Sequence, residues 1–278
     1  TLPMFNAYFN DLEYAGCKPV LSSLVKDENG VWRLDFDDIE KKIAANHVHV
    51  AIFSSPHNPT GRVWERWELK RLMDLFEQYR VIIIADETWC DWTLNGHQFI
   101  PMQTISEYAK YHTIANYGLS KPFGANGLNA AYTIIYNSYL KERLDTATGR
   151  TLLDTIGPFA EAAVIGSLCA EGAEWLDDAC ELINRNMNFA YEYVTNRLKG
   201  VETSLPDGTY LLVLDCEQWC KTHNISMKDL VQKGFEYGVI WASGEKNYGP
   251  YGIRLCLAHP FATVQEVFER LGKYVFVD

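Results

Sequence analysis

The sequence has no run of about 18 apolar residues, so nothing among its 278 residues is long and apolar enough to span a membrane as a helix. Its start, Thr1-Leu2-Pro3-Met4-Phe5, also lacks the charged beginning and apolar stretch of a signal peptide. Positive charge is scarce: the formal net charge is −11 and there is no basic run. These absences argue against a membrane or a nucleic acid as the main partner, and we expect a cytoplasmic protein.

Cysteine is too irregularly spaced for a disulfide framework. The seven cysteines are an odd number, and only Cys216 and Cys220 lie close together in the sequence. This Cys-x-x-x-Cys pair has no second pair of Cys or His residues at a spacing that suits zinc. We therefore expect reduced thiols that pack in the fold, and no metal site.

The first half of the chain alternates β-rich runs with amphipathic stretches, as α/β proteins do. The predicted strands are 18–25, 47–54, 81–85, 112–117 and 131–136, and the predicted helices are 36–45 and 65–79. Continuous apolar strands separated by helices predict a mostly parallel sheet.

The second half changes character. Residues 138–199 are largely helical, and 184–198 predict one long helix. After them come predicted strands at 209–214, 239–242 and 252–257 and predicted helices at 227–237 and 263–275. This pattern predicts a large domain over residues 1–160 and, over 161–278, connecting helices with a smaller α/β domain.

Polar side chains follow three of the predicted strands. Asn58, Asp86 and Lys121 each come shortly after a strand end, where open parallel sheets bind ligands, so we expect them to converge on one crevice. Each is weak evidence alone. A strand-closing Asp is usually a turn residue, a lone Lys is usually solvated, and Asn-Pro-Thr-Gly is also an ordinary turn.

Together with the C-terminal region, these residues resemble the class I/II aminotransferase superfamily, the fold-type-I enzymes that use pyridoxal 5′-phosphate (PLP). The matching motifs are Ser55-Pro56-His57-Asn58-Pro59-Thr60-Gly61, Ala85-Asp86-Glu87, Ser120-Lys121 and Gly252-Ile253-Arg254-Leu255. Their order and intervals agree with the family, and the resemblance covers essentially the whole chain. It implies an α/β fold with a mostly parallel large domain, a smaller C-terminal domain and a homodimer.

The resemblance also implies a role for each residue. Lys121 would carry PLP as a Schiff base and then move the substrate Cα proton. Asp86 would keep the ring nitrogen protonated, and Asn58 would donate to the ring oxygen and approach the substrate. Arg254 would bind the substrate carboxylate with its planar fork.

Three further positions are expected to lie at the cofactor, and a fourth, Gly118, departs from the family pattern. Phe5 stands where the family packs an aromatic ring on the cofactor, although a core role is about equally expected. Ser120 offers a hydroxyl donor. Trp89 replaces the family's Tyr, or the His that is usual in the lyase branch, and is either a pocket wall beside the cofactor or a packing residue. Gly118 replaces a common phosphate-binding Ser.

The branch can be narrowed. The run from Asp86 to Asp91 and the run Ser120-Lys121-Pro122-Phe123 look like cystathionine β-lyases and related C–S lyases. Asn129 stands where typical aminotransferases have a phosphate-binding Arg, which the lyase branch also lacks. A C–S β-lyase is therefore the first expectation, with an aminotransferase as the alternative.

A third alternative comes from the front of the chain. Family members have a segment before the Pro3-Met4-Phe5 motif that holds a Gly-rich phosphate loop at a helix N-terminus. Without that segment, we expect roughly five of the family's seven sheet strands and weak PLP retention. The chain would then be an inactive fragment.

Overall fold

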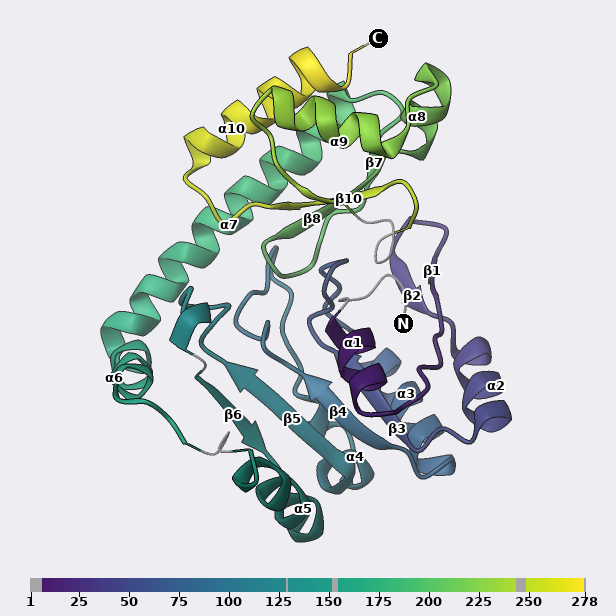
Figure 1. The fold of residues 1–278 in the computed structure, drawn as a ribbon, viewed down its shortest axis with the longest axis vertical. Coiled ribbons are helices and arrows are strands. Elements are labelled where there is room, and N and C mark those ends of the chain that lie inside the picture. Colours follow the sequence, from purple (N-terminus) through teal and green to yellow (C-terminus); the bar gives the residue numbers. More distant parts are fainter. Residues whose placement is uncertain (1–6, 129, 152–154, 244–248, 278) are drawn as a thin grey trace. The chain divides into compact units, whose positions relative to one another are not determined.

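The computed structural model describes residues 7–128, 130–151, 155–243 and 249–277 (Figure 1). By their internal contacts these residues form two compact units. The terminal unit contains the described residues of Thr1–Arg33, His57–Arg62 and Cys180–Asp278, and the central unit contains Leu34–Pro56 and Val63–Ala179. The predicted domains, 1–160 and 161–278, divide the chain differently and stay a prediction. Each unit is described by itself.

The central unit is built on one four-stranded sheet, visible in Figure 1. Its strands, in spatial order, are β3 (Val50–Ser54), β4 (Ile82–Asp86), β5 (Thr113–Gly118) and β6 (Ala131–Ile134). The first three run parallel and β6 pairs antiparallel with β5. The expectation of a mostly parallel sheet is confirmed, with four strands among the described residues rather than about five.

The register of this sheet brings the strand ends together. Ser54 lies opposite Asp86, and Asp86 lies opposite Asn116, so β3, β4 and β5 end side by side. In β4, Ile83 and Ala85 are completely buried, because alternate side chains of a covered strand point into the core. The buried and paired strand β4 therefore fixes the backbone position of Asp86.

The helices of the central unit begin where the sequence offers caps. The Asp35 side chain accepts from the Asp38 N–H at the start of α2 (Phe36–Asn46), and Glu65 and Glu68 form a capping box on α3 (Arg66–Gln78). Apolar residues at helical spacing on α3 are buried, namely Leu69, Leu72, Met73 and Phe76. The remaining helical segments are η1 (Met102–Thr104), α4 (Glu107–His112), η2 (Asn126–Leu128), α5 (Ser138–Gly149) and α6 (Pro158–Ser167).

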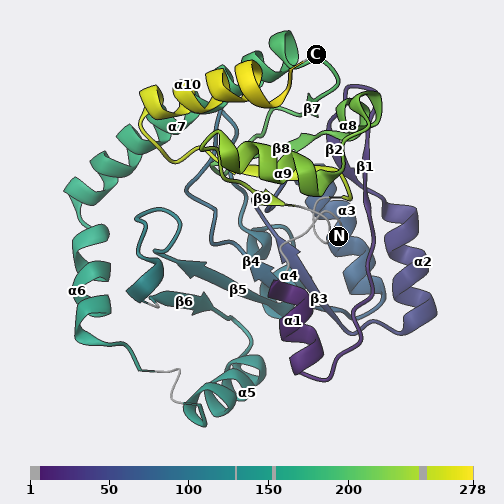
Figure 2. The same ribbon diagram turned by 45° about the horizontal axis from the view of Figure 1, so that its top comes forward.

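The terminal unit holds a second four-stranded sheet, all antiparallel. Its order is β7 (Glu202–Thr203), β8 (Leu211–Asp215), β10 (Gly252–Cys256) and β9 (Ala242–Ser243). Helices α8 (Glu217–His223), α9 (Met227–Glu236) and α10 (Phe261–Arg270) gather around it in Figure 2, and a π-helical turn, Leu271–Val275, follows α10. The unit also contains α1 (Ala7–Tyr14) and the strand β1 (Leu24–Lys26), which pairs with β2 (Trp32–Leu34).

Several predicted elements differ in length from those observed, and three of them show how. The strand predicted at 18–25 is only Leu24–Lys26, and the one predicted at 239–242 is Ala242–Ser243. The long helix, α7, is Ala170–Arg197 rather than 184–198. Gly172 lies in its first turn, and glycine lowers helix propensity, which hides the start of the helix in the sequence. Among the residues described, no helix is both long and apolar enough to cross a membrane.

Candidate active site

Lys121 lies in a tight turn that follows β5. The turn is closed by a hydrogen bond of 3.0 Å from the Phe123 N–H to the Leu119 carbonyl oxygen. Leu119 anchors the turn, because it is buried in a cluster with Ala130 and Ala160. The lysine itself stays partly exposed, so its amine is held on a fixed backbone and remains accessible. Ser120, half-buried, belongs to the same turn.

Asp86 closes β4, the strand next to the one that leads to Lys121. Its carbonyl oxygen accepts from the Ser55 N–H at 3.0 Å. Its Oδ1 accepts twice from Thr88, from the backbone N–H at 3.2 Å and from the hydroxyl at 2.7 Å. These bonds fix the orientation of the carboxylate at the carboxyl edge of the sheet.

Trp89 and Lys121 are in contact. Lys121 Nζ lies 5.3 Å from the centroid of the Trp89 ring, within the range of a cation–π interaction. The indole is buried, with 3% of its surface exposed. Trp89 is therefore a wall against which the lysine side chain rests, and its N–H can donate a hydrogen bond but cannot carry a proton to substrate.

Sequence reasoning assigned no task to Glu87, which the structure buries completely. Its Oε1 accepts from the Met102 N–H at 2.8 Å, and its Oε2 accepts from the Tyr117 hydroxyl. Burial raises the pKa of Glu87, while the bonds from Tyr117 and Met102 oppose that rise. The only signal available in the sequence was its place directly after Asp86.

In the terminal unit, Asn58 and Arg254 are hydrogen-bonded to each other. Arg254 Nη1 donates to Asn58 Oδ1 at 3.1 Å. Arg254 lies in the middle of β10, paired with Val213 on one side and Ala242 on the other, so the sheet fixes its base. Since Oδ1 of the buried Asn58 faces the arginine, the donor Nδ2 of the same amide points away from it.

The loop that carries Asn58, His57–Arg62, is bound to residues 204–209. The Gly208 N–H donates to the Gly61 carbonyl oxygen at 2.8 Å. Gly61 has a φ of +70°, and an alanine Cβ there would come within 2.6 Å of the Gly208 carbonyl oxygen. Only glycine meets both conditions without strain, which gives the Asn-Pro-Thr-Gly sequence a structural reason.

A buried ion pair fastens the same loop. The Arg62 guanidinium contacts the Asp207 carboxylate, and its Nε donates to the Trp32 carbonyl oxygen at 2.9 Å. His57 is also buried and its Nδ1 lies 2.7 Å from the Thr60 hydroxyl. Burial lowers the pKa of His57 to about 3, and the nearby Arg62 charge acts in the same direction. His57 is therefore a neutral structural residue at neutral pH.

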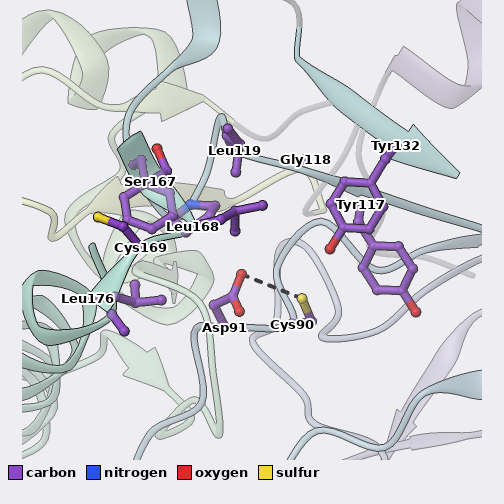
Figure 3. Close-up of a pocket in the computed structure, with 13 residues that line it drawn as sticks. Cys90, Asp91, Tyr117, Gly118, Leu119, Tyr132, Ser167, Leu168, Cys169 and Leu176 are labelled. Atoms are coloured by element: carbon purple, nitrogen blue, oxygen red, sulfur yellow. Dashed lines mark hydrogen bonds between the residues drawn. The ribbon is translucent and has the colours of Figure 1, made fainter. Parts of the chain in front are cut away.

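The central unit has a pocket of about 260 Å³ beside the Lys121 turn (Figure 3). Its wall includes Leu119, Pro122 and Phe123 from that turn. Figure 3 shows the Asp91 carboxylate turned toward Cys90, whose Sγ lies 3.6 Å from Oδ2. Burial, with the Asp91 charge, raises the pKa of Cys90 to about 12, so it stays a protonated thiol rather than a nucleophile.

The roles assigned to the candidate residues stay predictions. Asp86, Trp89, Ser120 and Lys121 belong to the central unit, and Asn58 and Arg254 to the terminal unit. Phe5 and Asn129 lie outside the described residues. At Gly118, a Cβ would meet the Ala130 carbonyl oxygen at 3.3 Å, a tight contact for any side chain at this position.

The model of the family "Aminotransferase class I and II" matches residues 2–271. The cystathionine beta-lyase PatB of Bacillus subtilis (strain 168) is 28% identical over 272 residues, which cover 97% of this chain and 69% of PatB.

The chain also matches solved structures of PLP-bound enzymes. A PLP-bound putative aminotransferase from Clostridium difficile 630 matches with a TM-score of 0.89 and 31% identity over 97% of this chain and 69% of its own. The PLP-bound C-S lyase from Staphylococcus hominis matches with a TM-score of 0.88 and 26% identity over 99% and 69%. The chain thus spans 69% of the length of each of these three proteins.

Proposed function

We propose that this chain, which belongs to the aminotransferase class I and II family, is a C–S β-lyase. It would convert cystathionine, cysteine or a related β-substituted amino acid into pyruvate, ammonia and a thiol. Its cofactor is PLP, as in the family. The observation that carries the proposal is the placement of Lys121 and Asp86 at the carboxyl ends of the neighbouring parallel strands β5 and β4. The preference for a lyase rests on the likeness to PatB and to the Staphylococcus hominis C-S lyase.

The side chains present suit PLP chemically. An accessible amine can bond to its aldehyde, a fixed carboxylate suits its ring nitrogen, and an amide and a hydroxyl suit its oxygens. We assign these tasks to Lys121, Asp86, Asn58 and Ser120. When bound, PLP supplies an electron sink that stabilises negative charge at the substrate Cα.

Lys121 is the proposed base. With its amine free, Lys121 would take the proton from the substrate Cα. The Trp89 ring, 5.3 Å from Nζ, limits where that amine can go and so keeps it close to the proton that it removes. Loss of the Cα proton then allows the Cβ–S bond to break, with the electron pair leaving on sulfur.

Asp86 is proposed to hold a proton on the ring nitrogen of the cofactor. A carboxylate beside that nitrogen favours its charged form. The two bonds from Thr88 to Oδ1 orient the carboxylate, so it need not reorganise during the reaction.

Arg254 and Asn58 are the proposed binding residues for the substrate. The guanidinium has several N–H groups in a plane, and Asn58 engages Nη1. The bond to Asn58 therefore orients the fork, which can bind the α-carboxylate of an amino acid in a bidentate manner. A homodimer, Phe5 as a ring packed on the cofactor, and a cytoplasmic location also belong to the proposal.

The reaction can be tested without any keto acid. Purified protein with added PLP and cystathionine should release pyruvate and a thiol in equal amounts. Lys121→Ala should abolish this release, and borohydride should no longer fix PLP to the chain. The matched control is Lys141→Ala, because the Lys141 side chain is exposed and its Nζ contacts Asp145 on the same helix, α5.

Two outcomes would refute the lyase. Amino-group transfer that depends on a keto acid, without thiol release, would identify an aminotransferase, the alternative that the Clostridium difficile structure favours at 31% identity. A purified chain that binds no PLP, even when PLP is in excess, would support the non-catalytic alternative.

A further inference from the structure

Glu87 is a buried acid that the proposed reaction does not use. Its side chain is completely buried, and each carboxylate oxygen accepts a hydrogen bond, from Met102 and from Tyr117. A buried charge is costly unless it is paired or hydrogen-bonded, so an acid at this position needs a reason that an apolar residue would not satisfy. The two hydrogen bonds supply that reason, because they connect Glu87 to Met102 on η1 and to Tyr117 on β5.

The Glu87–Tyr117 bond extends the β4–β5 ladder past its last backbone pair. Asp86 and Asn116 form that pair, and the Glu87 N–H still donates to the Asn116 carbonyl oxygen at 3.0 Å. After this pair, β4 leads into the segment that carries Trp89, and β5 leads into the segment that carries Lys121. The Glu87–Tyr117 bond is thus the side-chain link that follows the end of the sheet.

A second link joins the same two segments. Trp89, two positions after Glu87, contacts Lys121, four positions after Tyr117. Glu87, Trp89 and Tyr117 are all buried, whereas their neighbours Asp86, Thr88 and Asn116 are only partly buried. Both links therefore join the same two segments through buried side chains, one after the other along the chain.

We propose that Glu87 is a positioning residue whose bond to Tyr117 sets the register in which Lys121 meets the Trp89 ring. The proposal rests on the proposed function only in giving Lys121 its task. The carboxylate is required because its two oxygens accept from two donors, one on η1 and one on β5, whereas a glutamine offers a single acceptor oxygen. Asp86 is held as well, since it directly precedes Glu87 in the chain.

The test uses two variants with matched controls. Glu87→Gln removes one acceptor, and its control is Glu68→Gln, another completely buried glutamate of the central unit that caps α3. Tyr117→Phe removes one hydroxyl and keeps the ring stacked on Tyr132 at 5.1 Å. Its control is Tyr108→Phe, which removes a hydroxyl that donates to the Val81 carbonyl oxygen at 2.8 Å.

The readout is the rate at which PLP becomes fixed to Lys121 under borohydride, measured by mass spectrometry of the peptide well below the unfolding temperature. Glu87→Gln and Tyr117→Phe should each slow this rate by roughly tenfold and change the absorbance of the bound cofactor. The double variant should be slowed by less than the product of the two single effects, because both changes act on the same Glu87–Tyr117 contact. The two controls should lose stability and leave the rate unchanged.

Three other results would refute either the positioning role of Glu87 or the proposed function of Lys121. A rate in Glu87→Gln and Tyr117→Phe that matches their controls would refute the positioning role, even if both variants are less stable. Effects that multiply in the double variant would show that Glu87 and Tyr117 act separately, which also refutes it. PLP fixed to another lysine in Lys121→Ala would instead overturn the proposed function and leave the Glu87–Tyr117 link untouched.

Discussion

Replacing Gly61 by alanine should damage the protein more than the same change at a comparable glycine. Gly61 has a φ of +70°, and its Cβ would come within 2.6 Å of the Gly208 carbonyl oxygen. Gly16 has nearly the same backbone conformation, a φ of +71°, but nothing lies within 4 Å of its Cβ position. The pair therefore separates the cost of backbone conformation from the cost of close contact.

The magnitudes follow from these two terms. The left-handed backbone costs an L-residue about 1–2 kcal/mol, and both variants carry that cost. At Gly61 the contact adds about 1–3 kcal/mol, because the neighbouring atom is backbone and cannot rotate away. Urea denaturation should therefore show a loss of about 2–5 kcal/mol in Gly61→Ala and about 1–2 kcal/mol in Gly16→Ala.

A change in substrate affinity should accompany the loss of stability. The loop His57–Arg62 must move away from residues 204–209 to admit the methyl group, and Asn58 moves with it. Because Asn58 orients Arg254, KM for cystathionine should rise more than kcat falls. Equal losses of stability in the two variants would refute the close-contact argument, and an unchanged KM in Gly61→Ala would refute its link to substrate binding.

Three more predictions concern charge. Asp86→Asn should retain PLP, as absorbance can show, while kcat falls by orders of magnitude, because an amide cannot hold the proton on the ring nitrogen. Asp207→Ala removes the carboxylate that contacts the buried Arg62 guanidinium and should lower the free energy of unfolding in urea by about 3–5 kcal/mol. The pKa of His57, lowered to about 3 by burial, means that the unfolded chain takes up a proton first as the pH falls below 6.5. Stability should therefore fall by about 2 kcal/mol between pH 7 and pH 5, and His57→Gln should remove this part of the pH dependence.

Local patterns in the sequence were enough to predict the elements of the central sheet. The helix predicted at 65–79 is α3, Arg66–Gln78, because its apolar spacing and acidic start are both local properties. Asp86 and Lys121 follow their strands as expected, since a buried strand and the polar residue after it are adjacent in the chain. Such features depend on neighbours a few residues away, which a sequence displays directly.

Contacts between distant residues could not be read in the same way. Asn58 follows β3 in sequence, yet its loop groups with the terminal unit, where it bonds Arg254, 196 positions further along. Glu87 finds its partner Tyr117 across 30 positions. Neither pairing follows from periodicity or turn chemistry, because each depends on the register of strands. The motifs predicted the candidate residues, and the structure shows which contacts hold them.

The residues proposed for proton chemistry lie in the central unit, and those proposed for the substrate carboxylate lie in the terminal unit. Lys121 and Asp86, the residues assigned to proton chemistry, are held by bonds that stay within the central unit: the turn at Leu119 and the contacts with Thr88 and Trp89. The residues assigned to the substrate carboxylate, Asn58 and Arg254, are held within the terminal unit by β10 and by the locked loop. The hydrogen bonds described above for each set have both partners in one unit, so we expect a change that loosens one set to leave the other in place. Variants in the two units should then be distinguishable by whether KM or kcat responds.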